Sequence, residues 1–145
     1  MSTRPPTGAP PPTVAEIGDD RLDLVGLARE ICDRYRRHYP DEDERYGPAG
    51  MDWCRHDNQW LLSWAVGDVL GVTDLDEQAG WLARVLRSRD FPIDRLAHNL
   101  RLAGDVVQEN LPPGTGTPLA AALRRAAASV TEVVTGEGRA APSHP

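Results

Sequence analysis

The sequence has little cysteine, no long apolar run and a shortage of basic charge. Two cysteines in 145 residues are too few for a disulfide scaffold or for a metal site made of cysteines alone. No apolar run approaches the roughly 18 residues that span a bilayer, and the N-terminal segment lacks the apolar stretch of a secretory signal. We therefore expect a cytoplasmic protein with reduced cysteines and no membrane partner.

Basic charge is limited because 16 basic residues, all of them arginine, face 22 acidic ones and leave a net charge of −6. A nucleic-acid-binding surface needs an excess of basic side chains to neutralise phosphates. The most basic segment, 34–38, runs almost directly into an acidic run at 41–44, and these acids would compensate it. We expect no nucleic-acid partner.

The motifs of common enzymes and metal sites are also missing. The acidic run at 41–44 lacks the loop pattern of an EF-hand, no pair of Glu-x-x-His motifs indicates a di-metal bundle, and solvated charge explains the run more simply. The sequence contains no glycine-rich phosphate loop, no G-x-S-x-G elbow and no H-E-x-x-H. We predict no catalytic residue, no metal site and no cofactor, and hence a protein that is not an enzyme.

Proline marks the two ends of the chain. Five of the 13 prolines fall in the first twelve residues, and two more fall in the last four. Such segments are typical of extended or disordered chain. The sequence therefore predicts a disordered Pro-rich arm over 1–18, one helical domain over 19–136 and a short disordered tail over 137–145.

Between these ends, apolar residues recur with a period near 3.6, which is typical of amphipathic helices. Glycine and proline divide this pattern into five segments. The β-branched run at 130–135 has no second convincing strand to pair with, so we assign it to the last helix. The prediction is an all-α fold, a compact bundle of about five amphipathic helices. The expected helices cover about 20–39, 49–70, 73–90, 92–111 and 117–136.

Two threonines indicate where helices begin. Thr73, with Asp76 three residues on, has the form of a capping box. Thr117 is followed by Pro118, a residue well suited to the first position of a helix. We therefore expect the third helix to begin at Thr73 or Asp74 and the fifth to begin after Thr117.

The helix expected at 49–70 holds three of the four tryptophans within twelve residues. Their spacing of three and four residues, with one histidine included, places them on one face. Large aromatics beside an imidazole can wall a pocket, but the same stripe can also bury a helix in a bundle. An acidic neighbour of the histidine could orient a ligand. The candidate ligand- or partner-binding residues are Trp53, His56, Asp57, Trp60 and Trp64.

The histidines and cysteines do not form a catalytic pair in this pattern. Cys54 and His56 are two residues apart, so on a helix they point about 200° away from each other and cannot hydrogen-bond. Cys54 aligns instead with Leu61 and Ala65, which is a core stripe. His98 shares its helical face with charged residues and is expected to be solvated.

Two functions remain open. The first is a non-enzymatic regulatory or protein-interaction module of the bacterial cytoplasm, which binds a protein partner or self-associates. Seven of the eight aromatic residues lie between Tyr35 and Trp81, and interface anchors are enriched in Trp, Tyr and Arg. The second is a small-molecule or cofactor-binding sensor or carrier, whose Trp/His-lined pocket takes a small apolar ligand. We expect Trp60 and Leu61 to be core and Trp53 to be the exposed recognition residue.

Overall fold

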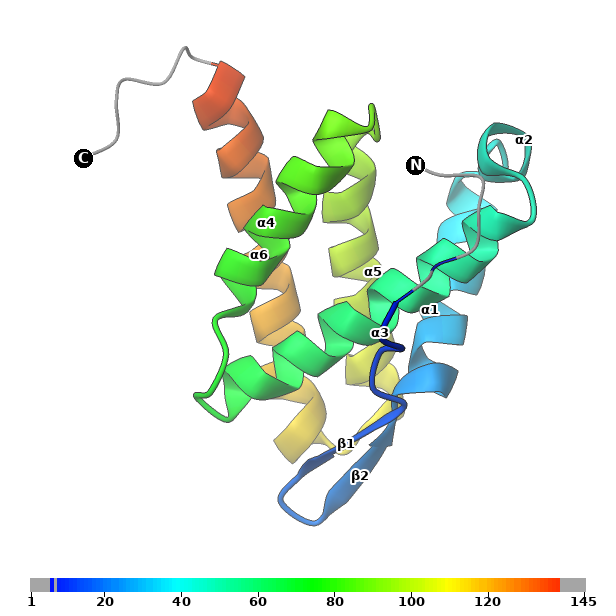
Figure 1. The fold of residues 1–145 in the computed structure, drawn as a ribbon. Helices are drawn as coiled ribbons and strands as arrows, with labels where there is room; N and C mark the ends of the chain where they lie inside the picture. Colours follow the sequence, from blue (N-terminus) through cyan, green and yellow to red (C-terminus); the bar gives the residue numbers. More distant parts are fainter. Residues whose placement is uncertain (1–5, 7, 139–145) are drawn as a thin grey trace.

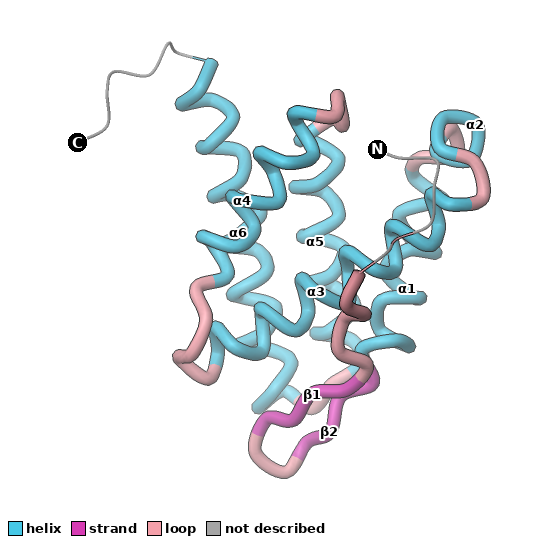
Figure 2. The backbone as a smooth tube through the Cα atoms, viewed as in Figure 1, coloured by secondary structure: helices cyan, strands magenta, loops and turns pink. Residues whose placement is uncertain are grey.

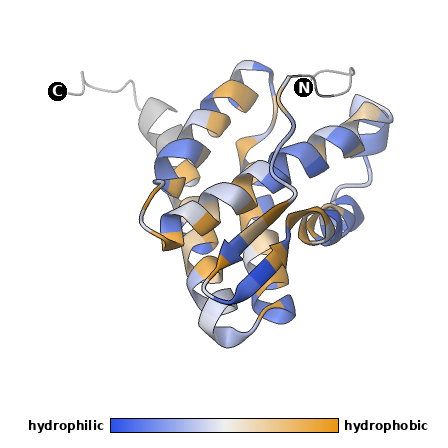
Figure 3. Cartoon of the chain, turned by 60° about the horizontal axis from the view of Figure 1, so that its bottom comes forward, coloured by the Kyte–Doolittle hydropathy of each residue, from blue (hydrophilic) through white to orange (hydrophobic). Residues whose placement is uncertain are grey.

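The computed structural model describes residue 6 and residues 8–138 (Figure 1), and its helices confirm the all-α prediction. The long helices carry both hydrophobic and hydrophilic residues (Figure 3), as amphipathic helices do. The elements of the described chain, a hairpin and six helices, are β1 (Val14–Ile17), β2 (Asp20–Asp23), α1 (Leu24–His38), α2 (Glu42–Tyr46), α3 (Ala49–Val69), α4 (Leu75–Ser88), α5 (Ile93–Asn110) and α6 (Pro113–Gly138).

Helix α5 is the central element of the bundle. It packs extensively against α6 and also contacts α1 and α4. Helix α3 crosses the bundle obliquely (Figures 1 and 2) and contacts α1, α4 and α6. The core is apolar and draws fully buried leucines from most of these helices, including Leu24, Leu61, Leu75, Leu100 and Leu123.

The N-terminal hairpin corrects two expectations. Val14–Ile17, assigned to the arm, pairs antiparallel with Asp20–Asp23, assigned to the first helix. A turn at residues 18 and 19 joins the strands, and Gly18 has a φ of +58°, which suits the tight turn of a hairpin. Leu22 is 1% exposed and anchors the hairpin on the core. Elsewhere in the predicted arm, the Pro12 carbonyl accepts a hydrogen bond from the Gln59 side chain of α3 at 3.2 Å. Of the predicted tail, residues 137 and 138 belong to α6. Residues 1–5, 7 and 139–145 lie outside the described residues.

The start of α1 also differs from the expected one, and the start of α4 matches the second of the two positions expected for it. Asp23 caps α1 by accepting a hydrogen bond from the Gly26 amide at 3.0 Å. Asp74, not Thr73, caps α4 by accepting one from the Glu77 amide at 3.1 Å. Both carboxylates satisfy amides that the first turn of a helix leaves unpaired.

Helix α6 begins one turn earlier than expected, at Pro113, and includes Pro118 within it. The start is fixed by tertiary contact, because Gly116 brings the first turn of α6 against the end of α5. A Cβ atom at Gly116 would lie 2.8 Å from the Val107 carbonyl oxygen. The run at 130–135 is helical, as predicted.

The acidic run is not simply solvated, because Glu42 at the start of α2 is 6% exposed. Its carboxylate accepts hydrogen bonds at 2.9 Å from the Tyr35 hydroxyl and from the Arg95 guanidinium. These bonds attach the short helix α2 to α1 and α5. Burial of Glu42 is tolerated because its charge is paired and hydrogen-bonded.

Candidate functional site

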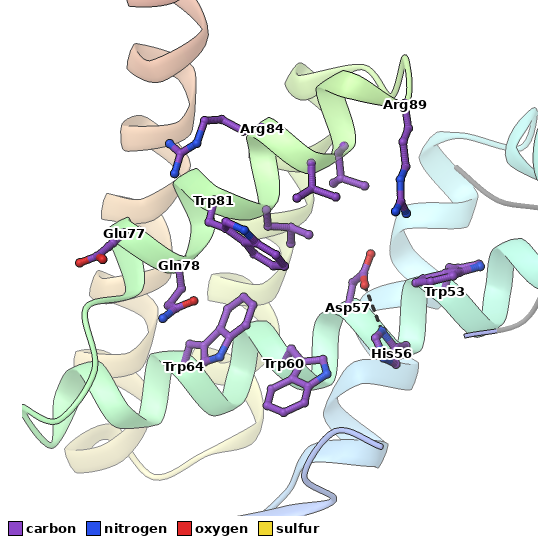
Figure 4. A pocket seen from close by; sticks show the side chains of 13 residues that line it. Trp53, His56, Asp57, Trp60, Trp64, Glu77, Gln78, Trp81, Arg84 and Arg89 are labelled. Atoms are coloured by element: carbon purple, nitrogen blue, oxygen red, sulfur yellow. Dashed lines mark hydrogen bonds and ion pairs between the residues drawn. The ribbon is translucent and has the colours of Figure 1, made fainter. Parts of the chain in front are cut away.

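A groove of about 770 Å³ lies between α3 and α4, and all four tryptophans of the chain line it (Figure 4). We term it the tryptophan groove. Its volume falls within the roughly 300–1,000 Å³ of typical small-molecule sites. The lining residues of α3 are Trp53, His56, Asp57, Trp60 and Trp64, and those contributed by or following α4 are Glu77, Gln78, Trp81, Leu82, Arg84, Val85, Leu86 and Arg89. All five candidate residues named from the sequence therefore meet in one groove.

The face of α3 that packs in the core lies beside the tryptophan stripe. Leu61 is 1% exposed and Ala65 is fully buried, whereas Trp60 is only half-buried. The indoles of Trp60 and Trp64 stack with their centroids 5.9 Å apart and their planes at 28°. The expectation that Trp60 belongs to the core is wrong, because it projects into the groove between α3 and α4 (Figure 4).

Trp81 completes the groove from the opposite helix, and sequence reasoning did not assign it to the site. It is the most exposed tryptophan, at 51%, whereas Trp53 is partly buried. Its position in the sequence could have identified Trp81 as a site residue, because it shares the polar face of its helix with Glu77 and Arg84. A large aromatic on a polar face marks a candidate binding surface.

Polar groups line both ends of the groove, and His56, Asp57 and Arg89 are the ones at its Trp53 end (Figure 4). His56 Nδ1 lies 3.2 Å from Asp57 Oδ1, and the Trp53 ring meets the imidazole edge-on at a centroid distance of 5.4 Å. Burial raises the pKa of Asp57, while the hydrogen bond with His56 and the charge of Arg89 oppose that rise. The groove thus combines flat apolar walls with a partly buried carboxyl group.

A smaller cavity of about 40 Å³ lies next to the groove, and Asp57 lines both. Cys54 also lines the smaller cavity and packs against the core, as its position in the sequence predicted. A hydrogen bond with Cys32 and burial together raise the pKa of the Cys54 thiol well above its ordinary value. This environment disfavours the thiolate that a cysteine nucleophile requires.

His98 is not a simple solvated histidine. The Tyr39 hydroxyl lies 2.6 Å from its Nδ1 atom, and the His38 ring meets it edge-on at a centroid distance of 4.6 Å. Desolvation, followed by the charges of His38 and Arg101, lowers the pKa of His98. The reason is tertiary, because the end of α1 lies beside this face of α5.

The described residues offer no group of three or more His, Cys, Asp and Glu side chains that could hold a metal ion. No helix in this part of the chain combines the length and the apolar character needed to cross a membrane. Comparisons of the chain with protein-family models, with curated proteins and with solved structures found no match. The chemistry of the tryptophan groove is therefore the basis for a functional proposal.

Proposed function

We propose that this chain is a small-molecule sensor or carrier that binds a flat, largely apolar ligand in the tryptophan groove. One observation carries the proposal: two helices bring all four tryptophans to a single groove, and Trp81 keeps half of its surface exposed there. Exposed aromatic surface in water is unfavourable and is covered when a ligand binds. A non-enzymatic binding role requires no catalytic group.

The dimensions of the groove favour a small ligand. A volume of about 770 Å³ accommodates a molecule of drug or cofactor size. Apolar side chains of α4, Leu82 and Val85 among them, line the groove between its aromatic walls. Large aromatic walls and few polar groups are the usual composition of such sites.

A regulatory protein-interaction module of the cytoplasm is the second candidate function. Leu70 and Val72, in the loop that joins α3 to α4, are 51% and 78% exposed, and these side chains could extend an interface beyond the groove. A stable protein interface buries about 1,600 Å² in total, much more than a groove of this size provides. Small-molecule binding is therefore the better-supported function.

The test uses N-phenyl-1-naphthylamine, a neutral probe whose fluorescence rises in apolar sites, excited directly so that tryptophan emission does not contribute. We expect saturable binding to the full chain. Trp81→Ala should weaken binding by about tenfold or more, which corresponds to about 1.4 kcal/mol. Its partial exposure means that the variant should still fold. Val14→Ser, which changes an exposed apolar residue of the hairpin, is the matched control and should bind normally.

Absence of saturable probe binding, or equal affinity in Trp81→Ala and the unchanged chain, would contradict the proposal. The second function predicts a different result. In that case the chain would self-associate with increasing concentration in light scattering, and Val72→Ser would reduce the association while the probe failed to bind.

A further inference from the structure

We propose that the tryptophan groove selects planar heteroaromatic rings with a cyclic amide edge, in which an N–H lies beside a C=O, and that Asp57 accepts the N–H. This inference rests on the proposed small-molecule function and names the class of ligand. Its basis is the arrangement of an acceptor and a donor at the Trp53 end of a groove that has flat aromatic walls (Figure 4).

The acceptor is the Asp57 carboxylate. Its Oδ1 atom is engaged with His56 Nδ1 at 3.2 Å, and its Oδ2 atom makes no hydrogen bond with the described residues. The side chain points into the groove (Figure 4), and 20% of its surface is exposed. An ionised carboxylate has only acceptor sites, so it selects a ligand group that donates a hydrogen.

The donor is the Arg89 guanidinium. It extends toward Asp57 from the residue that follows α4 (Figure 4), and its charge acts on the Asp57 carboxyl group. A guanidinium carries five N–H donors, so it can serve a ligand carbonyl while keeping another partner. The N–H and C=O of a cyclic amide match this pair of neighbouring groups. A cationic ligand would meet Arg89 and an anionic ligand would meet Asp57, so the pair favours an uncharged edge.

The walls determine the shape of the ligand. Trp60 and Trp64 present nearly parallel indoles, and Trp81 lines the groove from α4 (Figure 4). Indole faces stack on planar rings with little cost in side-chain entropy. Because the chain carries a net charge of −6, the ligand is a free heterocycle and not a base within a nucleic-acid strand.

The test compares quinolin-2(1H)-one with 1-methylquinolin-2-one, two probes that differ by replacement of the N–H with an N-methyl group. Their affinities for the full chain are measured by displacement of N-phenyl-1-naphthylamine. We expect the N–H form to bind about tenfold more tightly, the effect of one hydrogen bond worth about 1.4 kcal/mol. In Asp57→Leu this ratio should fall to near one. Asp52→Leu makes the same change at an exposed position of α3 outside the groove and should preserve the ratio.

Two outcomes would overturn the inference while leaving the proposed function intact. One is equal affinity for the two quinolinones in a chain that still binds the displaced probe. The other is tighter binding of 2-naphthylmethylamine, a cationic probe, than of quinolin-2(1H)-one. If Asp57→Leu fails to fold by circular dichroism, Asp57→Ala, which also lacks a hydrogen-bond acceptor, replaces it. An unchanged ratio in the variant used would assign recognition of the N–H to another group and would also refute the inference.

Discussion

Asn58 of α3 and Asn99 of α5 exchange two hydrogen bonds inside the apolar core. The Asn99 Nδ2 atom donates to Asn58 Oδ1 at 2.8 Å, and the Asn58 Nδ2 atom donates to Asn99 Oδ1 at 3.0 Å. The two residues are 2% and 6% exposed. This pair fixes the helix that carries most of the tryptophan groove to the central helix of the bundle.

Replacing only one asparagine of this pair should cost more than half of the stability that is lost when both are replaced. Asn99→Leu should destabilise the fold by about 1–3 kcal/mol, because it leaves the Asn58 Oδ1 atom buried without its partner. The double variant Asn58→Leu/Asn99→Leu should cost less than the sum of the two single changes. Urea unfolding of the four proteins measures the coupling, and strictly additive effects would contradict it.

Neighbouring residues of α3 should differ in their contribution to stability. Leu61→Ala should cost about 2–5 kcal/mol, because it creates a cavity in the core. Trp60→Ala should cost only about 1 kcal/mol, a typical value for a side chain outside the core. Denaturant midpoints of the two variants make the comparison. A greater loss in Trp60→Ala would place the indole in the core after all.

The lowered pKa of His98 makes stability depend on pH. The folded-state pKa lies below the ordinary value of 6.5, so the folded chain binds this proton less readily than the unfolded chain does. The His98 contribution to stability is therefore present above pH 6.5 and is lost as pH falls through the folded-state pKa. His98→Gln should lose less stability than the unchanged chain between about pH 7.5 and 5. Parallel stability curves for the two proteins would exclude this role.

Two glycines at the start of α6 allow the same substitution to be compared at an open position and at a crowded one. No atom lies within 4 Å of a Cβ placed at Gly114, whereas one placed at Gly116 lies 2.8 Å from the Val107 carbonyl oxygen. Gly114→Ala should stabilise the fold by up to about 1 kcal/mol through a less flexible unfolded chain. Gly116→Ala should destabilise it by about 1–3 kcal/mol through overpacking. Thermal unfolding of both variants gives the comparison, and changes of equal sign would refute it.

Much of the helical fold could be predicted from the sequence, because a 3.6-residue apolar period is a local property of the chain. Helix ends were harder to predict. The first helix begins at Leu24 and not near Asp20, since β1 offers the preceding residues a strand partner. The start of α6 at Pro113 depends on the close approach of Gly116 to α5. Such contacts join distant segments and leave no periodic signal.

The candidate site likewise has features that follow from the sequence and features that depend on tertiary packing. By itself, the sequence determined that Trp53, His56, Trp60 and Trp64 share one face of a helix, because residues three and four apart always do. Only the tertiary structure decided that this face borders a groove and that Trp81 lies across it. The angle at which α4 leaves α3 controls whether the stripe is covered or open. That angle follows from the packing of α3 and α4 with the rest of the bundle, so it cannot be read from the spacing within either helix.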